Sequence, residues 1–121
     1  MNSPTVIADR YIEVWNEADP EKRSALLAEY WAPDVTYVDP LMSGNGREEI
    51  GALIGGVHSR FPGFEFALIG QPDGHGAFVR FSWALGPVGQ EAPIGGSDVV
   101  EVTDGKMRRV IGFLDKVPAG A

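Results

Sequence analysis

The chain has 121 residues, no cysteine and a formal net charge of −7, and 44% of its residues are hydrophobic. A chain of this length forms one domain, residues 1–121, with a single core. The absence of cysteine excludes disulfides, thiolate catalysis and cysteine-ligated zinc. The acidic balance and the scattered basic residues argue against binding to nucleic acid or to an anionic membrane. Because no apolar stretch approaches the ~20 residues of a membrane span and no signal-peptide pattern opens the chain, we expect a soluble cytoplasmic protein.

Three helices are predicted in the first half of the chain. The first begins at Ser3-Pro4, a capping residue followed by proline, and Asp19-Pro20 repeats this signal for the second. The second helix is expected to stop at Ala32-Pro33. The third follows a turn at residues 44–46 and ends at Pro62-Gly63. Its three internal glycines each lower its helix propensity by roughly 1 kcal/mol relative to alanine, so tertiary packing must stabilise it.

Strands dominate the rest of the chain. One strand is predicted at residues 35–39, and alternation with period two predicts four more, near residues 64–69, 77–85, 96–103 and 107–115. Hairpin turns are predicted at Pro72-Asp73-Gly74 and at Asp104-Gly105, because Asp-Gly supplies the positive φ values that tight turns demand. Helices segregated from a run of antiparallel strands indicate an α+β domain.

Two aspartates follow the apolar phase of the predicted strands. Asp39 is in phase with Val35 and Tyr37, and Asp98 is in phase with Val100, so each should lie on the buried side of its strand. Burying an unpaired charge is costly, and paired acids with environment-shifted pKa values are a common means of acid/base chemistry near neutral pH. The pattern indicates an active site. The structural alternatives are that Asp39 caps the turn that follows it and that Asp98 satisfies nearby backbone N–H groups.

The sequence also resembles a known family. The order of elements, Tyr11 in the first helix, DVTYVDP at residues 34–40, Gly46-Arg47 at the start of the third helix and SDVVEVTDGKM at residues 97–107 resemble the SnoaL-like polyketide cyclase and ketosteroid isomerase group of the nuclear-transport-factor-2-like superfamily. The resemblance covers nearly the whole chain. It implies a curved antiparallel sheet wrapped into a cone around three helices and a ligand cavity, usually with a homodimer across the outer sheet face. Because the superfamily includes enzymes, binding proteins and transport adaptors, the fold leaves the function open.

The resemblance also suggests catalytic roles for three residues. In the isomerase a strand-end Asp before Pro shuttles the proton, and a Tyr on the first helix with a protonated Asp on a late strand stabilises the enolate oxygen. These roles correspond to Asp39, Tyr11 and Asp98. Asp98 is also the best match for the acid with which polyketide cyclases catalyse an aldol closure. The alternative for Tyr11 is a core tyrosine with its hydroxyl at the cavity mouth. Gly96 stands where limonene epoxide hydrolases of the superfamily carry an Arg, which disfavours that chemistry.

Large inward-facing side chains are expected to line the ligand cavity. His58 is included because it follows Ile54 by one helical turn, and its alternative is a structural or solvent-facing position. For the aromatic rings, the alternative is that they fill the core. The ligand is expected to be a small hydrophobic molecule. The expected lining comprises Trp15, Trp31, Ile54, His58, Phe61, Trp83 and Phe113.

Two classes of function follow from these observations. The first is a cofactor-independent enzyme that transfers protons next to a carbonyl, by isomerisation or aldol cyclisation. The second is a non-catalytic ligand-binding or dimeric scaffold protein. No metal-ligand spacing or phosphate-binding loop occurs, so neither a metal nor a cofactor is expected. A homodimer is expected because the outer face of the late strands carries an apolar set, which comprises Phe78, Ala84, Val99, Ile111 and Phe113.

Overall fold

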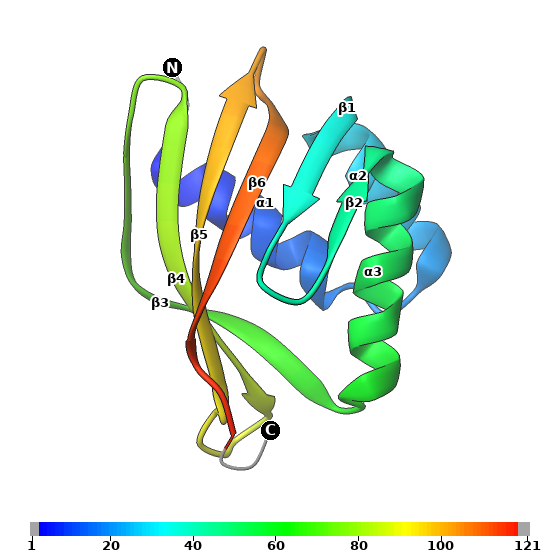
Figure 1. Ribbon diagram of the computed structural model, residues 1–121, viewed down its shortest axis with the longest axis vertical. Coiled ribbons are helices and arrows are strands. Elements are labelled where there is room, and N and C mark those ends of the chain that lie inside the picture. The colour runs from blue at the N-terminus through cyan, green and yellow to red at the C-terminus, as the bar shows by residue number, and fades with distance from the viewer. Residues whose placement is uncertain (1–2, 119–121) are drawn as a thin grey trace.

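Three helices and six strands form the part of the chain that the structure, a computed structural model, describes, residues 3–118 (Figure 1). The helices are α1 (Pro4–Asn16), α2 (Pro20–Tyr30) and α3 (Gly46–Arg60). The strands are β1 (Trp31–Val38), β2 (Ser43–Asn45), β3 (Phe64–His75), β4 (Phe78–Pro87), β5 (Ile94–Thr103) and β6 (Lys106–Lys116). No helix among these residues is long and apolar enough to cross a membrane.

The first two helices begin at the predicted caps. The Ser3 hydroxyl accepts a hydrogen bond from the amide of Val6, and the Asp19 carboxylate accepts one from the amide of Glu21 at 2.9 Å. The second helix ends at Tyr30, slightly before the predicted stop. There the guanidinium of Arg47 on α3 donates to the carbonyl of Trp31 at 2.6 and 2.9 Å. This contact satisfies a carbonyl that the helix end leaves unpaired.

Helix α3 is stabilised by packing against α2, as its glycines require. A methyl group at Gly51 would lie 3.3 Å from Leu27 of α2, and one at Gly55 would lie 3.1 Å from Nη1 of Arg23. Arg23 is buried, and its guanidinium donates to the carbonyls of residues 17, 18 and 51. These glycines therefore let a buried arginine join the end of α1 to α3. Gly56 has open space around it.

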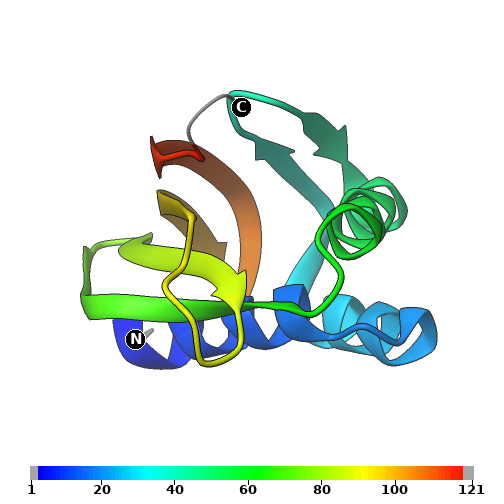
Figure 2. The same cartoon turned by 90° about the horizontal axis from the view of Figure 1, so that it is seen from below.

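The strands form one curved, unclosed sheet in the order β2-β1-β6-β5-β4-β3. Figure 2 shows the bend of this sheet, with α1 crossing beside the β3–β4 end and α3 beside β1 and β2. The α+β cone fold is thus confirmed, with one correction to the antiparallel pattern. Strands β1 and β6 pair in parallel, with Tyr37 beside Val110. The short strand β2 was not predicted, and it pairs with β1 where a turn was expected.

The two predicted hairpin turns have different outcomes. The turn at Asp104-Gly105 is confirmed, and both residues have positive φ, 53° and 78°. The turn at Pro72-Asp73-Gly74 is wrong, because β3 continues to His75 and the chain reverses at Gly76, where φ is 56°. Asp73 is paired with Arg80 across the two strands, and their side chains form a salt bridge of 2.8 Å. The Pro-Asp-Gly sequence that indicated the turn lies instead at an irregularity in the pairing of β3 with β4, between Ile69 and Asp73.

The two faces of the sheet differ in character. The inward face is buried and carries Val79, Phe81 and Val100, against which α1 packs. The outward face carries charged residues and an apolar cluster that we call the outer patch. In this patch Val38 of β1 pairs with Ile111 of β6, which pairs with Val99 of β5. The outer patch comprises Val38, Val99, Ile111 and Phe113, of which Val38 and Phe113 are exposed.

Candidate active site

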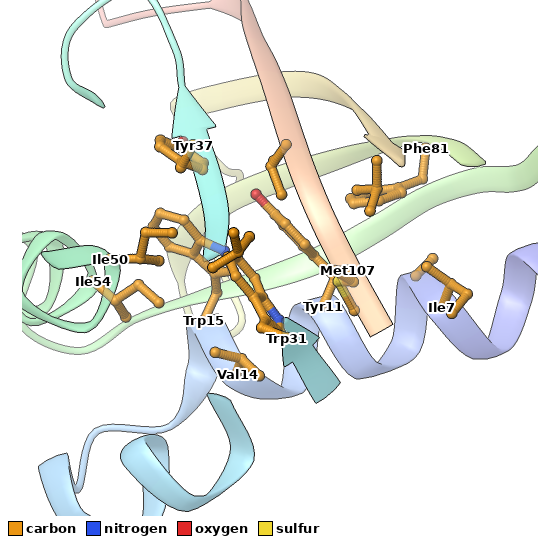
Figure 3. Close-up of a cluster of buried hydrophobic side chains, with 14 of the residues drawn as sticks. Ile7, Tyr11, Val14, Trp15, Trp31, Tyr37, Ile50, Ile54, Phe81 and Met107 are labelled. Carbon is orange, nitrogen blue, oxygen red and sulfur yellow. The ribbon is translucent and has the colours of Figure 1, made fainter. Parts of the chain in front are cut away.

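The centre of the site is a hydrogen-bonded pair, Tyr11 on α1 and Asp98 on β5. Helical spacing places Tyr11 on the same buried face as Ile7 and Trp15. Figure 3 shows the Tyr11 hydroxyl directed away from the helix axis, with Trp31 beside its ring. The hydroxyl donates to Oδ2 of Asp98, which is only 1% exposed. The alternation of residues along β5 thus places a carboxylate in the core, where it accepts a hydrogen bond from a tyrosine.

Burial controls the protonation of both groups. It raises the pKa of Asp98 to about 6, while the hydrogen bonds from Tyr11 and Trp83 oppose this rise and the charge of Asp39 adds to it. Burial and the neighbouring charge of Asp98 raise the pKa of the Tyr11 hydroxyl well above its usual value. Tyr11 therefore stays a neutral hydrogen-bond donor, whereas Asp98 titrates close to physiological pH.

Asp39 lies on the same side of the sheet and is partly buried, just after β1. Its Oδ2 accepts a hydrogen bond of 2.5 Å from the Tyr37 hydroxyl. Its Oδ1 accepts from the amides of Leu41 and Met42 at 2.7 and 2.9 Å. Burial, followed by the bond to Asp39, raises the pKa of the Tyr37 hydroxyl. Asp39 thus caps the turn that follows it, as the structural alternative described, and it also lines the cavity.

Gly112 of β6 lies between the two carboxylates. It pairs with Asp98 across β5 and β6, and it lines the cavity. A methyl group at this position would lie 2.9 Å from Oδ1 of Asp98 and 3.3 Å from Cβ of Asp39. Even a methyl group would press on the Asp98 carboxylate there, so glycine is what allows both aspartates to approach this point of β6. The arrangement brings both carboxylates into the wall of one cavity.

The carboxylates open into a cavity of about 240 Å³. A Leu/Ile/Phe-lined cavity of about 150 Å³ accommodates benzene, and drug-sized ligands occupy roughly 300–1,000 Å³. The volume therefore suits a compact ligand of one or two rings. Polar residues in the wall include Tyr11, Tyr37 and Arg60. The apolar wall comprises Trp15, Leu41, Met42, Val57, Phe61, Phe66, Trp83, Leu85, Ile94, Phe113, Leu114, Val117 and Pro118.

The structure divides the residues that we expected to line the cavity. Trp15, Phe61, Trp83 and Phe113 lie in its wall, although the strand phase turns Phe113 towards the outer patch and leaves it 53% exposed. The others lie elsewhere, for reasons of packing, and they comprise Trp31, Ile54 and His58.

The corrections have specific causes. Trp31 begins β1 and is fully buried. Its ring stacks on the ring of Tyr11, with the two ring centroids 5.7 Å apart. Ile54 is fully buried within the core. His58 lies 2.8 Å, through Nε2, from the carbonyl of Trp15, so it links α3 to α1. The structural alternative for His58 therefore describes its position.

Sequence reasoning missed several residues of the wall. Tyr37 carried a usable signal, because it is in phase with Asp39 and two residues before it. Leu41 and Met42 follow Asp39 in a segment without periodicity, and Arg60 ends α3 at the mouth. Gly112 offers no side-chain signal at all. Its importance becomes visible once the pairing of β5 with β6 is known.

Within residues 3–118, no cluster of three or more His, Asp or Glu side chains is placed to hold a metal ion. The side chains that surround the centre of the site offer two carboxylates, two phenols and one indole N–H. Such groups exchange protons and donate hydrogen bonds to oxygen.

Comparisons with known proteins agree with this architecture. The model of the SnoaL-like domain matches residues 8–110. The chain belongs to the SnoaL-like family. A solved structure of a SnoaL-like protein from Agrobacterium tumefaciens, described as a proposed isomerase, is 45% identical with a TM-score of 0.90, and the match covers 95% of this chain and 99% of that one.

Solved structures of lower sequence identity share the fold. A proposed ketosteroid isomerase from Kribbella flavida is 20% identical with a TM-score of 0.71, and the match covers 98% of this chain and 82% of that one. A proposed SnoaL-like polyketide cyclase from Jannaschia is 17% identical with a TM-score of 0.71, with 95% and 90% covered. None of the curated proteins matches the sequence significantly.

Proposed function

We propose that this SnoaL-like protein is an enzyme that transfers a proton next to a carbonyl group of a small hydrophobic ketone. The observation that carries the proposal is Asp98, a carboxylate that is 1% exposed, has a pKa of about 6 and faces an apolar cavity. A general acid or base works best when its pKa lies near the working pH. Burial raises the pKa of Asp98 into this range, and the opposing hydrogen bonds from Tyr11 and Trp83 do not cancel that rise.

In this proposal Asp98 acts first as the base. At pH 7 most of the Asp98 carboxylate is ionised, and it takes the proton from the carbon next to the carbonyl. The electron pair of that C–H bond moves towards the carbonyl oxygen, which becomes an enolate. Protonation of Asp98 weakens it as an acceptor for the Tyr11 hydroxyl. Tyr11 can then donate to the enolate oxygen, which stabilises the charge that develops there.

The second step decides the product class, and Asp39 bears on it. If the ketone is β,γ-unsaturated, its dienolate can be protonated at the γ-carbon, which moves the double bond and isomerises the ketone. If it attacks a second carbonyl of the same molecule, a new C–C bond closes a ring. Asp39 lines the same cavity as Asp98, which supports a part for it in the first outcome. Its oxygens already accept from Tyr37 and two backbone amides, which supports a structural role and the second outcome.

Deuterium exchange tests the proposal. In D₂O the protein should catalyse exchange of the α-hydrogens of a cyclic ketone such as cyclohexanone, followed by proton NMR. We expect Asp98→Asn to lower the exchange rate by about 10²-fold or more, the usual scale for a lost general base. Asp34→Asn is the matched control, because Asp34 is exposed and pairs with Arg108 on the surface. It should leave the rate unchanged.

The Asp39→Asn variant separates the two reaction types. A loss as large as that of Asp98→Asn indicates a shuttle between two carboxylates, as isomerisation requires. A loss below about tenfold indicates that Asp98 works alone, as in aldol cyclisation. If the wild-type protein binds ketones but exchanges none of them faster than Asp98→Asn does, the enzyme proposal fails. The protein is then better explained as a non-catalytic ligand-binding protein.

A further inference from the structure

Trp83 contacts the same carboxylate as Tyr11, but from the other side. Its indole Nε1 donates to Oδ1 of Asp98 at 3.1 Å, whereas Tyr11 donates to Oδ2. Each oxygen of this buried carboxylate thus has one side-chain donor. The two donors come from different elements, β4 and α1. The proposed reaction uses Tyr11 and Asp98, and it assigns no task to the indole.

A glycine allows the indole to reach Asp98. Trp83 and Gly96 are direct partners across β4 and β5. A methyl group at position 96 would lie 2.3 Å from Cζ2 and 2.8 Å from Cε2 of the indole. Any side chain there would displace the ring. Because Asp98 is two residues beyond Gly96 on the same face of β5, the ring lies over the glycine and meets the carboxylate.

A second aromatic ring holds the indole in place. Phe66 of β3 packs edge-on against it, with ring centroids 5.3 Å apart and an angle of 65°. The indole is therefore held between Phe66 and β5, and its N–H group has a fixed direction. Within residues 3–118, the indole N–H groups of the other two tryptophans, Trp15 and Trp31, are buried and have no hydrogen-bond partner.

Trp83, Asp98 and Gly112 all line the cavity. Oδ1 receives the Trp83 N–H and lies so close to β6 that a methyl group at Gly112 would be 2.9 Å away, so the strand closes that side of the carboxylate. A ligand in the cavity therefore meets the carboxylate in the orientation that its two donors hold. The carboxylate cannot turn away without losing both of its side-chain donors.

We propose that Trp83 is a positioning residue that fixes the orientation of the Asp98 carboxylate in the wall of the cavity, where the substrate's reacting C–H group is received. The proposal rests on the proposed function for the role of Asp98. An indole N–H that donates to the carboxylate stabilises its ionised form, which is the form that accepts a proton. Trp83 thereby keeps the base both oriented and available.

The test compares two Trp→Phe variants. Trp83→Phe keeps an aromatic ring but removes the N–H donor, whereas Trp31→Phe removes a buried indole N–H that has no partner. The Asp98 pKa is followed by the ¹³C shift of its carboxyl group. A hydrogen bond to a charged group contributes roughly 1.5–3 kcal/mol, and one pKa unit corresponds to about 1.4 kcal/mol. We therefore expect Trp83→Phe to raise the Asp98 pKa by about one unit or more and Trp31→Phe to leave it in place.

Kinetics distinguish positioning from mere wall contact. As the pH rises through the Asp98 pKa, the rate of ketone exchange should rise to a plateau. In Trp83→Phe this rise should move to higher pH by the same amount as the NMR titration, and kcat should fall more than KM changes.

One measurement needs no variant. The indole N–H proton resonance of Trp83 should titrate with the Asp98 pKa in the wild-type protein, whereas that of Trp31 should not. Equal Asp98 pKa values in Trp83→Phe and Trp31→Phe, or a Trp83 resonance that ignores the Asp98 titration, would overturn the proposal. A Trp83-dependent pKa in a protein that exchanges no ketone would uphold the positioning of Asp98 while the proposed enzymatic function fails.

Discussion

Asp98 is the residue at which stability and the proposed chemistry oppose each other. Its pKa is about 6 in the folded protein, against about 3.9 for an Asp in an unfolded chain. The folded state therefore binds this proton more tightly. The contribution of Asp98 to stability is fully present below about pH 4 and is lost as the pH rises through 6. At neutral pH the protein retains a buried carboxylate that its fold would be more stable without.

We expect Asp98→Asn to remove this pH dependence. Between pH 5 and pH 8 the wild type should lose ~1–1.5 kcal/mol of unfolding free energy relative to the variant, because the amide has no charge to desolvate. Urea denaturation at both pH values measures the difference. Asp34→Asn, on the surface, should follow the wild type. If the Asp98→Asn and wild-type curves run parallel, Asp98 does not have a raised pKa.

The sequence sufficed to identify both carboxylates but not the exact wall of the cavity. Strand alternation determines which side of a sheet a residue faces, and this placed Asp39 and Asp98 on the inward face. Helical periodicity is less informative here, because a buried helix face can meet either the cavity or another element. Trp31 and Ile54 were correctly expected to be buried, but they pack within the core rather than along the cavity.

Among the elements, α3 shows how tertiary packing overrides helix propensity. Gly55 faces Arg23 at close range, whereas Gly56, the next residue, has no atom within 4 Å of the position of a methyl group. We expect Gly56→Ala to stabilise the protein by about 0.5–1 kcal/mol through helix propensity alone. Gly55→Ala should gain nothing or lose stability, because its methyl group would press on the buried guanidinium of Arg23. Thermal or urea unfolding of the two variants provides the comparison.

This pair of variants has a clear contrary outcome. Equal stabilisation by Gly55→Ala and Gly56→Ala would mean that α2 and α3 can move apart to accommodate a methyl group. Arg23 would then be less firmly fixed than its hydrogen bonds to three carbonyls suggest. The sequence predicted the helix and the need for packing. It could not show which glycine faces α2, because that depends on the angle at which the two helices meet.

At the scale of the whole molecule, the pairing of β1 with β6 is the feature that the sequence could not show. It joins residues far apart along the chain, with Val38 beside Ile111, and local alternation contains no information about such a partner. This pairing creates the outer patch, because it brings Val38 next to Ile111 and Val99. Val38, Val99 and Ile111 face the opposite side of the sheet from Asp98, whereas Phe113 also lines the cavity, so assembly through the patch would leave the carboxylates inside each subunit.

We therefore expect the protein to be a homodimer that covers the outer patch, since contiguous exposed apolar patches usually mark interaction sites. Sedimentation at micromolar concentration should give twice the mass of one chain. Ile111→Glu should shift the protein to a monomer, because it places a charge at the centre of the patch, where desolvation is costly. Ala25→Glu is the control, on an exposed position of α2 away from the sheet, and it should remain dimeric. A wild-type protein that sediments as a monomer, or an Ile111→Glu variant that stays dimeric, would place the subunit contact elsewhere or remove it.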